Sequence, residues 1–158
     1  MRSYPFQMSI QVTLLAKECD IQDIDTLLCS AQEAIGLKQT FCSSENRPKR
    51  LEWLEAKLKY DLLWVIRDGS GLVGVLILEQ DPLARVDGIA YIVVAERMRR
   101  QRKIGPRLVQ KAQTLANGGF LKAEARNDNS RRLLEKCGFQ WEQECSSSGH
   151  PILIWSRS

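Results

Sequence analysis

The amino-acid sequence predicts an α/β fold in which about six or seven strands form one mixed central sheet, with helices on both of its faces. Apolar runs of strand length alternate with segments whose apolar residues recur every three or four positions, which is the spacing of a helix. The resulting order is strand, helix, helix, three strands, helix, strand, helix and two strands. The strands on either side of the third helix are joined by a crossover and should be parallel, whereas the earlier strands form an antiparallel meander.

The chain begins with a short strand and two helices. Residues 11–15 are the expected strand, and Asp20 is the expected N-cap of a helix that ends at Gly36. The second helix begins at Pro48, because proline is favoured in the first helical turn and leucines follow it at spacings of three or four. Both helices therefore precede the main strands of the sheet.

Turn residues separate the main strands. Residues 62–67 and 72–78 are apolar runs joined by Asp68-Gly69-Ser70-Gly71, a strong hairpin signal. A longer strand covers residues 85–94, and the helix that starts at Gly105 ends near residues 117–119. The remaining elements are an alternating strand at residues 120–126 and a short helix that is capped by Asn127 or Asn129 and extends up to residue 137. A closing hairpin follows, with strands at residues 139–145 and 151–155.

Length and composition predict a single domain that covers residues 1–158. Apolar residues make up 44% and charged residues 27% of the chain, which is ordinary for a globular protein and excludes a disordered or fibrous one. The N-terminus lacks the apolar core of a signal peptide, and no apolar run approaches the length of a membrane span. We therefore expect a cytoplasmic protein without membrane association.

Cysteine and histidine usage argues against a metal site. The five cysteines are odd in number, widely spaced and without a Cys-x-x-Cys pair, which fits reduced thiols better than disulfides or zinc ligands. The single histidine, His150, lies in a polar turn and is expected to be an exposed loop residue. The sequence therefore predicts no metal cofactor.

The most informative segment is the basic turn between residues 97 and 108, which lies between a strand and a helix. Five of the seven residues from Arg97 to Lys103 are cationic. The first turn of a helix has backbone N–H groups without partners and a partial positive charge, so an anion can bind there without a metal. The net charge of the whole chain is only +4, which favours an anionic ligand over a surface built for nucleic acid.

A second motif follows one helix and one strand later. It runs from Asn127 to Phe139 and closes in Gly-Phe. Together with the basic turn, in which Arg100 to Gly105 matches a family pattern of Arg/Gln-x-x-Gly-x-Gly/Ala except for Lys103, it resembles the GNAT superfamily of acyl-coenzyme A-dependent N-acyltransferases. An alternative register keeps Arg99 in the common position and treats one later cation as an insertion. The resemblance covers nearly the whole chain.

This resemblance implies acetyl-coenzyme A as cosubstrate. Pyrophosphate is expected on the backbone amides of residues 100–105, and the pantetheine arm is expected to pair with the strand at residues 93–94, beside a bulge near Ala95. Asn127 is either a helix cap or a coenzyme contact, and the two roles are compatible. The implied coenzyme-binding residues are Val93, Val94, Arg99, Arg100, Gln101, Arg102, Lys103, Ile104, Gly105, Asn127 and Ser130.

Two departures from the family pattern matter. Lys103 replaces a glycine and Pro106 removes an N–H, so the turn should bind phosphate more through side-chain charge and be more sensitive to salt. The family often has a tyrosine in the last helix that protonates the leaving thiolate, and its place falls on Leu134. Cys137 is a weaker candidate donor, since a cysteine beside Gly138 is more often simple packing.

The implied reaction is direct attack of a neutral amine on a thioester within a ternary complex. The backbone N–H of Val94 is the expected oxyanion donor. Because a lysine-like amine is only about 0.1% neutral near pH 7.4, a general base is expected. By strand position the candidates are Glu79, Asp87 and Glu96, and each of them has a purely structural or solvated alternative.

The acceptor is a small-molecule or protein amine whose identity is left open, as is a homodimer. The resemblance implies that residues 36–50 and 144–151 line the acceptor pocket, but their mixed charges select no substrate class. A non-catalytic acyl-coenzyme A-binding module is the main alternative, because the usual tyrosine is absent. A nucleic-acid-binding protein is the least favoured class, since no nucleic-acid motif accompanies the basic turn.

Overall fold

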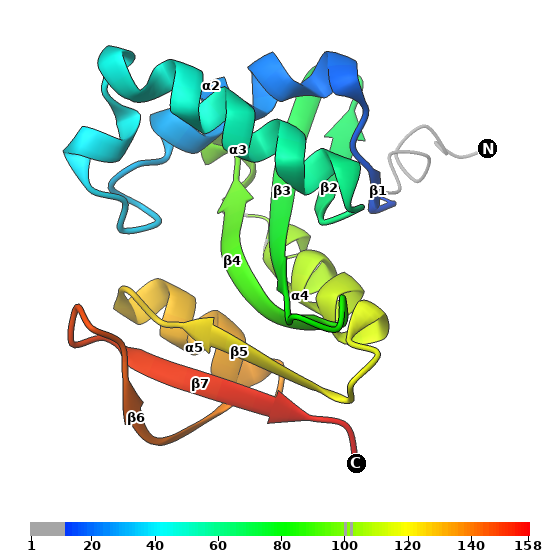
Figure 1. Cartoon of the computed structure of the whole chain (residues 1–158), viewed down its shortest axis with the longest axis vertical. Helices are drawn as coiled ribbons and strands as arrows, with labels where there is room; N and C mark the ends of the chain where they lie inside the picture. The colour runs from blue at the N-terminus through cyan, green and yellow to red at the C-terminus, as the bar shows by residue number, and fades with distance from the viewer. Residues whose placement is uncertain (1–11, 100, 102) are drawn as a thin grey trace.

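The computed structural model describes residues 12–99, 101 and 103–158, and Figure 1 shows how its helices and strands are arranged. The elements up to the fourth strand, in which η denotes a 3-10 helix, are β1 Leu14–Leu15, η1 Glu18–Asp20, α2 Ile21–Ser30, η2 Gln39–Cys42, η3 Ser44–Asn46, α3 Arg47–Lys59, β2 Leu63–Asp68, β3 Gly71–Gln80 and β4 Val86–Val94. The later elements are η4 Glu96–Met98, α4 Ile104–Leu115, β5 Phe120–Glu124, α5 Asp128–Lys136, β6 Gln140–Cys145 and β7 Pro151–Ser156.

These elements confirm the predicted mixed α/β class and the predicted order of helices and strands. The seven strands form one sheet in the order β1-β2-β3-β4-β5-β7-β6. Strands β1 to β4 form the antiparallel meander, β4 and β5 are parallel, and β5, β7 and β6 are again antiparallel. The predicted hairpin turn is present, since Asp68 pairs with Gly71.

The first helix differs from its prediction at both ends. Asp20 stands at the N-cap position of α2 but makes no capping bond to the helix. Its carboxylate instead accepts the backbone N–H of Lys17 at 2.7 Å and pairs with Arg67. The regular helix stops at Ser30, and tighter turns continue to Gly36, which has a φ of +71°. A Cβ on Gly36 would lie 2.8 Å from the Cβ of Arg126, so the chain needs glycine there both for its conformation and for space.

Two hydrophobic clusters cover the two faces of the sheet. Helices α4 and α5 pack on one face, and α2 and α3 pack on the other. Because β3 is buried on both faces, it reads in the sequence as a continuous apolar run. Representative residues of the first cluster are Leu76, Leu78, Leu108 and Leu134, and those of the second are Val75, Ile77, Ile24 and Leu54.

A glycine in β3 allows α4 to approach the sheet closely. A Cβ on Gly74 would lie 2.8 Å from Cγ2 of Ile104 and 3.1 Å from Cδ1 of Leu108. Real Cβ atoms do not tolerate the shorter distance without a shift of the neighbour. The start of α4 is therefore held against the middle of the sheet.

The sheet is split between β4 and β5. Only Gly88 with Lys122 and Ile89 with Ala123 pair across this junction in the described residues. Figure 1 shows β5 and β7 running at a steep angle to β3 and β4, so that the strands diverge beyond the junction. The register of β4 against β3 slips by one residue at Ala90, between the pairs of Ile77 and Leu78. The expected bulge near Ala95 is therefore wrong in position, because the irregularity lies where β5 departs.

Candidate active site

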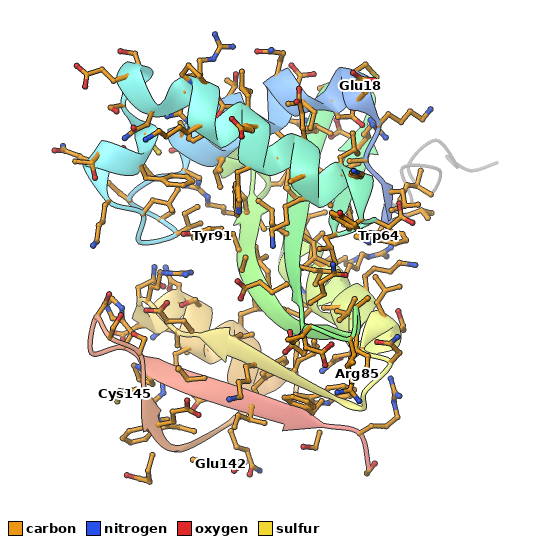
Figure 2. All side chains as sticks on the ribbon, viewed as in Figure 1. Glu18, Trp64, Arg85, Tyr91, Glu142 and Cys145 are labelled. Carbon is orange, nitrogen blue, oxygen red and sulfur yellow. The ribbon has the colours of Figure 1, made fainter. Side chains whose placement is uncertain are left out.

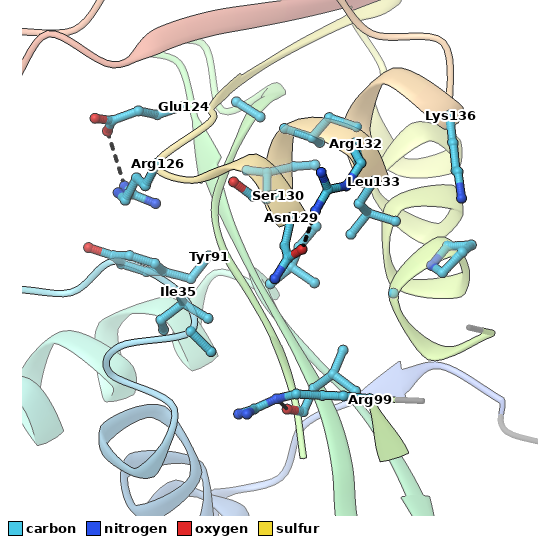
Figure 3. Close-up of a pocket in the computed structure, with 18 of the residues that line it drawn as sticks. Ile35, Tyr91, Arg99, Glu124, Arg126, Asn129, Ser130, Arg132, Leu133 and Lys136 are labelled. Atoms are coloured by element: carbon cyan, nitrogen blue, oxygen red, sulfur yellow. Dashed lines mark hydrogen bonds and ion pairs between the residues drawn. The ribbon is translucent and has the colours of Figure 1, made fainter. Parts of the chain in front are cut away.

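A cavity of about 680 Å³ lies where β4 and β5 diverge. Its walls come from β4, β5, the start of α4, α5 and the turn that follows α2. Figure 3 shows Tyr91, Glu124 and Arg126 near one another at one end, and Arg132 and Lys136 on the opposite side. The cavity thus has an end that contains an acid and an aromatic ring, and a side that carries cations.

The open edge of β4 presents backbone groups to this cavity. The N–H of Ala95 donates to the carbonyl of Val73 at 2.8 Å, so this pair is hydrogen-bonded in the ladder. Because such groups alternate along an antiparallel strand, the N–H and C=O groups of Ile92 and Val94 face away from β3, toward β5. No described residue of β5 pairs with them. An extended ligand with amide groups could satisfy them as an additional strand would.

Two arginines hold carbonyl groups of this open edge. Nε of Arg99 donates to the carbonyl of Val94 at 3.1 Å. At the other end, Nη1 of Arg126 donates to the carbonyl of Ala90 at 3.2 Å, and its guanidinium stacks 4.4 Å from the ring centroid of Tyr91. Arg126 therefore bridges the two diverging strands at the point where their pairing ends.

Cations from α5 complete one wall of the cavity. Arg132 and Lys136 lie one turn apart on the same helical face, and both line the cavity. Arg132 is oriented by Oδ1 of Asn129, which accepts its Nη2 at 2.7 Å. This pair was not predicted from the sequence, although its spacing of four on a predicted helix was a usable signal. With Arg99 and Arg126 it makes four cationic side chains around the cavity.

The predicted coenzyme-binding residues divide into several groups. Five line the cavity: Val94, Arg99, Gln101, Gly105 and Ser130. Val93 and Ile104 are buried in the two cores, and Lys103 is exposed at the N-cap of α4. Arg100 and Arg102 lie outside the described residues. The structure thus brings Ile92, rather than Val93, to the cavity beside Val94.

Asn127 uses its amide within the fold. Its Oδ1 accepts the N–H of Ser130 at 2.8 Å, and its Nδ2 donates to the carbonyl of Ala34 at 2.7 Å. It therefore caps α5 and also ties the turn after α2 to the cavity wall. Gly105 has a packing role as well, because a Cβ there would lie 3.1 Å from Cδ2 of Leu133.

The three acids predicted as candidate bases do not line this cavity. Glu79 is exposed, and one of its carboxylate oxygens would lie 3.4 Å from a Cβ on Gly88. Asp87 is half-buried, and burial together with the charge of Asp81 raises its pKa. Glu96 is exposed in η4. Their catalytic role stays a prediction without a contact to support it.

Glu124, at the end of β5, does line the cavity. Its Oε2 accepts Oγ of Ser146 at 2.8 Å and lies 3.0 Å from Nδ1 of His150, while its Oε1 lies 3.2 Å from Nη2 of Arg126. Burial disfavours the charged form, but the two hydrogen bonds and the charge of Arg126 outweigh it and hold the pKa of Glu124 below its ordinary value.

His150 was predicted to be an exposed loop residue. Its position in a loop is confirmed, but its exposure is not. It is half-buried because Glu124 pairs with Ile152 in the β5–β7 ladder, which brings the β6–β7 turn beside the end of β5. No residue of the range 144–151, His150 included, is part of the cavity lining, and no residue of 36–50 is. Ala34 and Ile35, just before the second range, line it instead.

Aromatic side chains support the acidic end of the cavity. Tyr91 packs between Phe41 and Trp53, with ring centroids 6.3 and 6.1 Å away, and burial raises its pKa. Leu134, at the position where the family often has tyrosine, lines the cavity without a proton to donate. Cys137 is half-buried against the core outside the lining, and burial raises its pKa.

Across residues 12–99, 101 and 103–158, no cluster of three or more His, Cys, Asp or Glu side chains could hold a metal ion. In the same residues no helix has both the length and the apolar character needed to cross a membrane. The site is thus an open strand edge with cations along one wall and a single described acid, Glu124, in its lining.

Known proteins share both sequence features and the fold of this chain. The sequence matches the model of the acetyltransferase (GNAT) family over residues 30–139, whereas no curated protein matches it. The structure is similar to that of PaiA N-acetyltransferase from Thermoplasma acidophilum in complex with coenzyme A, with a TM-score of 0.74, 14% identity and coverage of 92% of this chain and 98% of that one.

Two further solved structures have the same fold. A GNAT-family acetyltransferase from Streptococcus agalactiae has a TM-score of 0.71 and 15% identity, with coverage of 94% of this chain and 96% of that one. The structure of YncA from Salmonella typhimurium with its cofactor acetyl-CoA has a TM-score of 0.69 and 16% identity, with 94% of each chain covered.

The fold and the split-sheet cavity define an acyltransferase with the GNAT architecture. The family match extends over more than half of the sequence, from the last residue of α2 to Phe139, the residue before β6. The chain belongs to the acetyltransferase (GNAT) family.

Proposed function

We propose that this protein is an N-acetyltransferase that transfers an acetyl group from acetyl-coenzyme A to a primary amine. The observation that carries the proposal is the open edge of β4, where the N–H and C=O of Ile92 and the N–H of Val94 face a cavity with cations along its wall and pair with no described residue of β5. Coenzyme A matches both features, because its pantetheine arm carries amide groups and its phosphates are anionic.

The residues present fit this cosubstrate. Ile92 would pair with the pantetheine amides, and Arg99, Arg132 and Lys136 would meet the phosphates as charged donors. Pro106 takes one N–H from the first turn of α4, so these side chains carry more of the phosphate binding than backbone amides do. The bound thioester supplies the activated acetyl group. The N–H of Val94 is the proposed donor to the carbonyl oxygen on which charge develops.

The first experiment measures ligand binding by thermal melting. At a concentration a hundred times its dissociation constant, coenzyme A should stabilise the protein by about 2.7 kcal/mol. Each of Arg132→Gln and Lys136→Gln should weaken binding about tenfold and reduce its salt dependence, because a hydrogen bond to a charged group contributes about 1.5–3 kcal/mol. The matched control is Lys49→Gln, an exposed lysine on α3, which covers the other face of the sheet. Absence of a shift with both coenzyme A and acetyl-coenzyme A contradicts the proposal.

The second experiment measures thiol release from acetyl-coenzyme A with a panel of amino acids, monoamines, polyamines and a lysine peptide. Release that depends on an amine supports the enzyme. A melting shift without release from any amine favours a non-catalytic coenzyme-binding module, for which the position of Leu134 is the structural argument.

A further inference from the structure

The proposed reaction needs a proton acceptor near the amine. A primary alkylamine is almost entirely an ammonium ion at neutral pH, and about one molecule in a thousand is neutral when its pKa is near 10.4. None of the acids that the sequence suggested reaches the cavity, whereas Glu124 does. It lies at the end of the cavity away from Arg132 and Lys136, together with Tyr91 and Arg126 (Figure 3).

The hydrogen bonds around Glu124 leave its Oε1 open as an acceptor. A carboxylate has about four lone-pair positions, two on each oxygen. Ser146 and His150 occupy both positions of Oε2, and Nη2 of Arg126 lies 3.2 Å from Oε1 as an ion pair. No hydrogen bond joins Oε1 to another described residue. The side chain is 23% exposed, so a ligand can reach it while the carboxylate stays fixed from behind.

Resting on the proposed function, we propose that Glu124 is the catalytic base that receives the proton of the acceptor ammonium ion. The N–H bond of the ammonium breaks, its proton goes to Oε1, and its electron pair stays on nitrogen and forms the C–N bond. As that bond forms, a second proton leaves nitrogen and passes through water to the sulfur that departs with the C–S bond pair. Water then takes the first proton from Glu124 after the product leaves.

Ser146, His150 and Arg126 position the carboxylate for this role. They come from the β6–β7 turn and from the residue two places after Glu124, and they hold both oxygens at hydrogen-bond or ion-pair distance. Arg126 is itself fixed by the carbonyl of Ala90 at the strand junction. The base is therefore held beside the junction of β4 and β5, at the end of the cavity that contains Tyr91.

The test compares two nucleophiles in wild type and Glu124→Gln. The first is the monoamine that gives the fastest thiol release in the panel, and the second is hydroxylamine, which is uncharged at neutral pH and needs no proton removed before it attacks. We expect Glu124→Gln to lower kcat/KM for the monoamine about 100-fold, the low end of general-base contributions, and to lower it less than about tenfold for hydroxylamine. For the monoamine, the kcat/KM of Glu124→Asp should lie between the values of wild type and Glu124→Gln.

Two controls separate catalysis from folding. Glu142→Gln changes an exposed acid of β6 outside the cavity, visible in Figure 2, and should leave both rates unchanged. The coenzyme A melting shift of Glu124→Gln should equal that of wild type, which shows an intact coenzyme site.

The outcomes distinguish this inference from the function on which it rests. An active wild type whose Glu124→Gln variant is equally active, or loses the same factor with both nucleophiles, overturns the role of Glu124 alone. A wild type that releases no thiol with any amine overturns the proposed function, and the role of Glu124 with it.

Discussion

Arg50 offers the sharpest test of how the α2–α3 side of the fold is held together. It is 5% exposed, and its Nε and Nη2 donate to Asp25 at 2.7 and 3.3 Å. Its Nη1 donates to the carbonyls of Phe41 and Ser43 at 2.7 and 2.6 Å. One side chain of α3 therefore ties α2 to the loop whose Phe41 packs on Tyr91 at the cavity.

The structure sets the expected loss for Arg50→Met. Removal of one partner of a buried ion pair costs about 3–5 kcal/mol, because the other charge stays buried. Here Arg47, half-exposed and 3.6 Å from Asp25, would offset part of that cost. The two loop carbonyls would lose their charged donor as well, at about 1 kcal/mol or more each where water cannot replace it. We therefore expect Arg50→Met to lower the free energy of unfolding by about 3 kcal/mol.

Urea unfolding with a double-mutant cycle measures this loss. Arg50→Met combined with Asp25→Leu should be less destabilised than the sum of the two single variants, since no charge remains buried. The matched control is Arg85→Met, whose partner Asp81 lies 2.8 Å away in an exposed pair, and it should cost less than about 1 kcal/mol. A loss below about 1 kcal/mol for Arg50→Met, or additive losses in the cycle, would refute the reasoning.

Three other predictions follow from features described above. Gly74→Ala should lower stability by about 1–3 kcal/mol in thermal unfolding, because its Cβ would press on Ile104 of α4; an unchanged melting temperature contradicts that contact. The hydrogen bond from Arg97 lowers the pKa of Asp68. The stability that this ionised carboxylate adds to the fold is therefore complete above its unfolded pKa of about 3.9 and is lost as pH falls through its folded pKa. Arg97→Gln should therefore lose less stability than wild type between neutral pH and pH values below the folded pKa of Asp68, as measured by urea unfolding at a series of pH values. If the variant and wild type lose the same stability in acid, the ion pair of Arg97 with Asp68 does not contribute as described. Four cations against one acid in the cavity lining should make a triamine a poorer acceptor than a monoamine, with a gap in kcat/KM that narrows as salt is added; a triamine that is equally good excludes this field effect.

Periodicity and turn residues were sufficient to predict the elements. The apolar run of residues 72–78 became the doubly buried β3, and the spacing of four after Pro48 became α3. The early end of α2 could not be predicted, because the turn to Gly36 is set by contacts with Arg126 and Asn127, about ninety residues away in the sequence. Local pattern carries no information about such pairs.

The cavity illustrates the same limit. Its β4 edge and its basic turn were predictable, since both lie in one continuous segment. Glu124 was read only as the polar face of an alternating strand, and His150 only as a turn residue. Their contact depends on the register of β5 with β7, in which Glu124 faces Ile152, and nothing in either segment alone specifies that register.

The weak junction between β4 and β5 has a consequence for local unfolding. Residues paired across it are 34 positions apart in the sequence, and just two such pairs form in the described chain, so a fluctuation can separate these strands while the meander stays intact. That separation destroys the cavity, whereas fraying of the two-residue β1 leaves it whole. A ligand that binds in the cavity therefore opposes the first fluctuation by RT ln(1 + [L]/Kd), which grows with its concentration, and the second not at all.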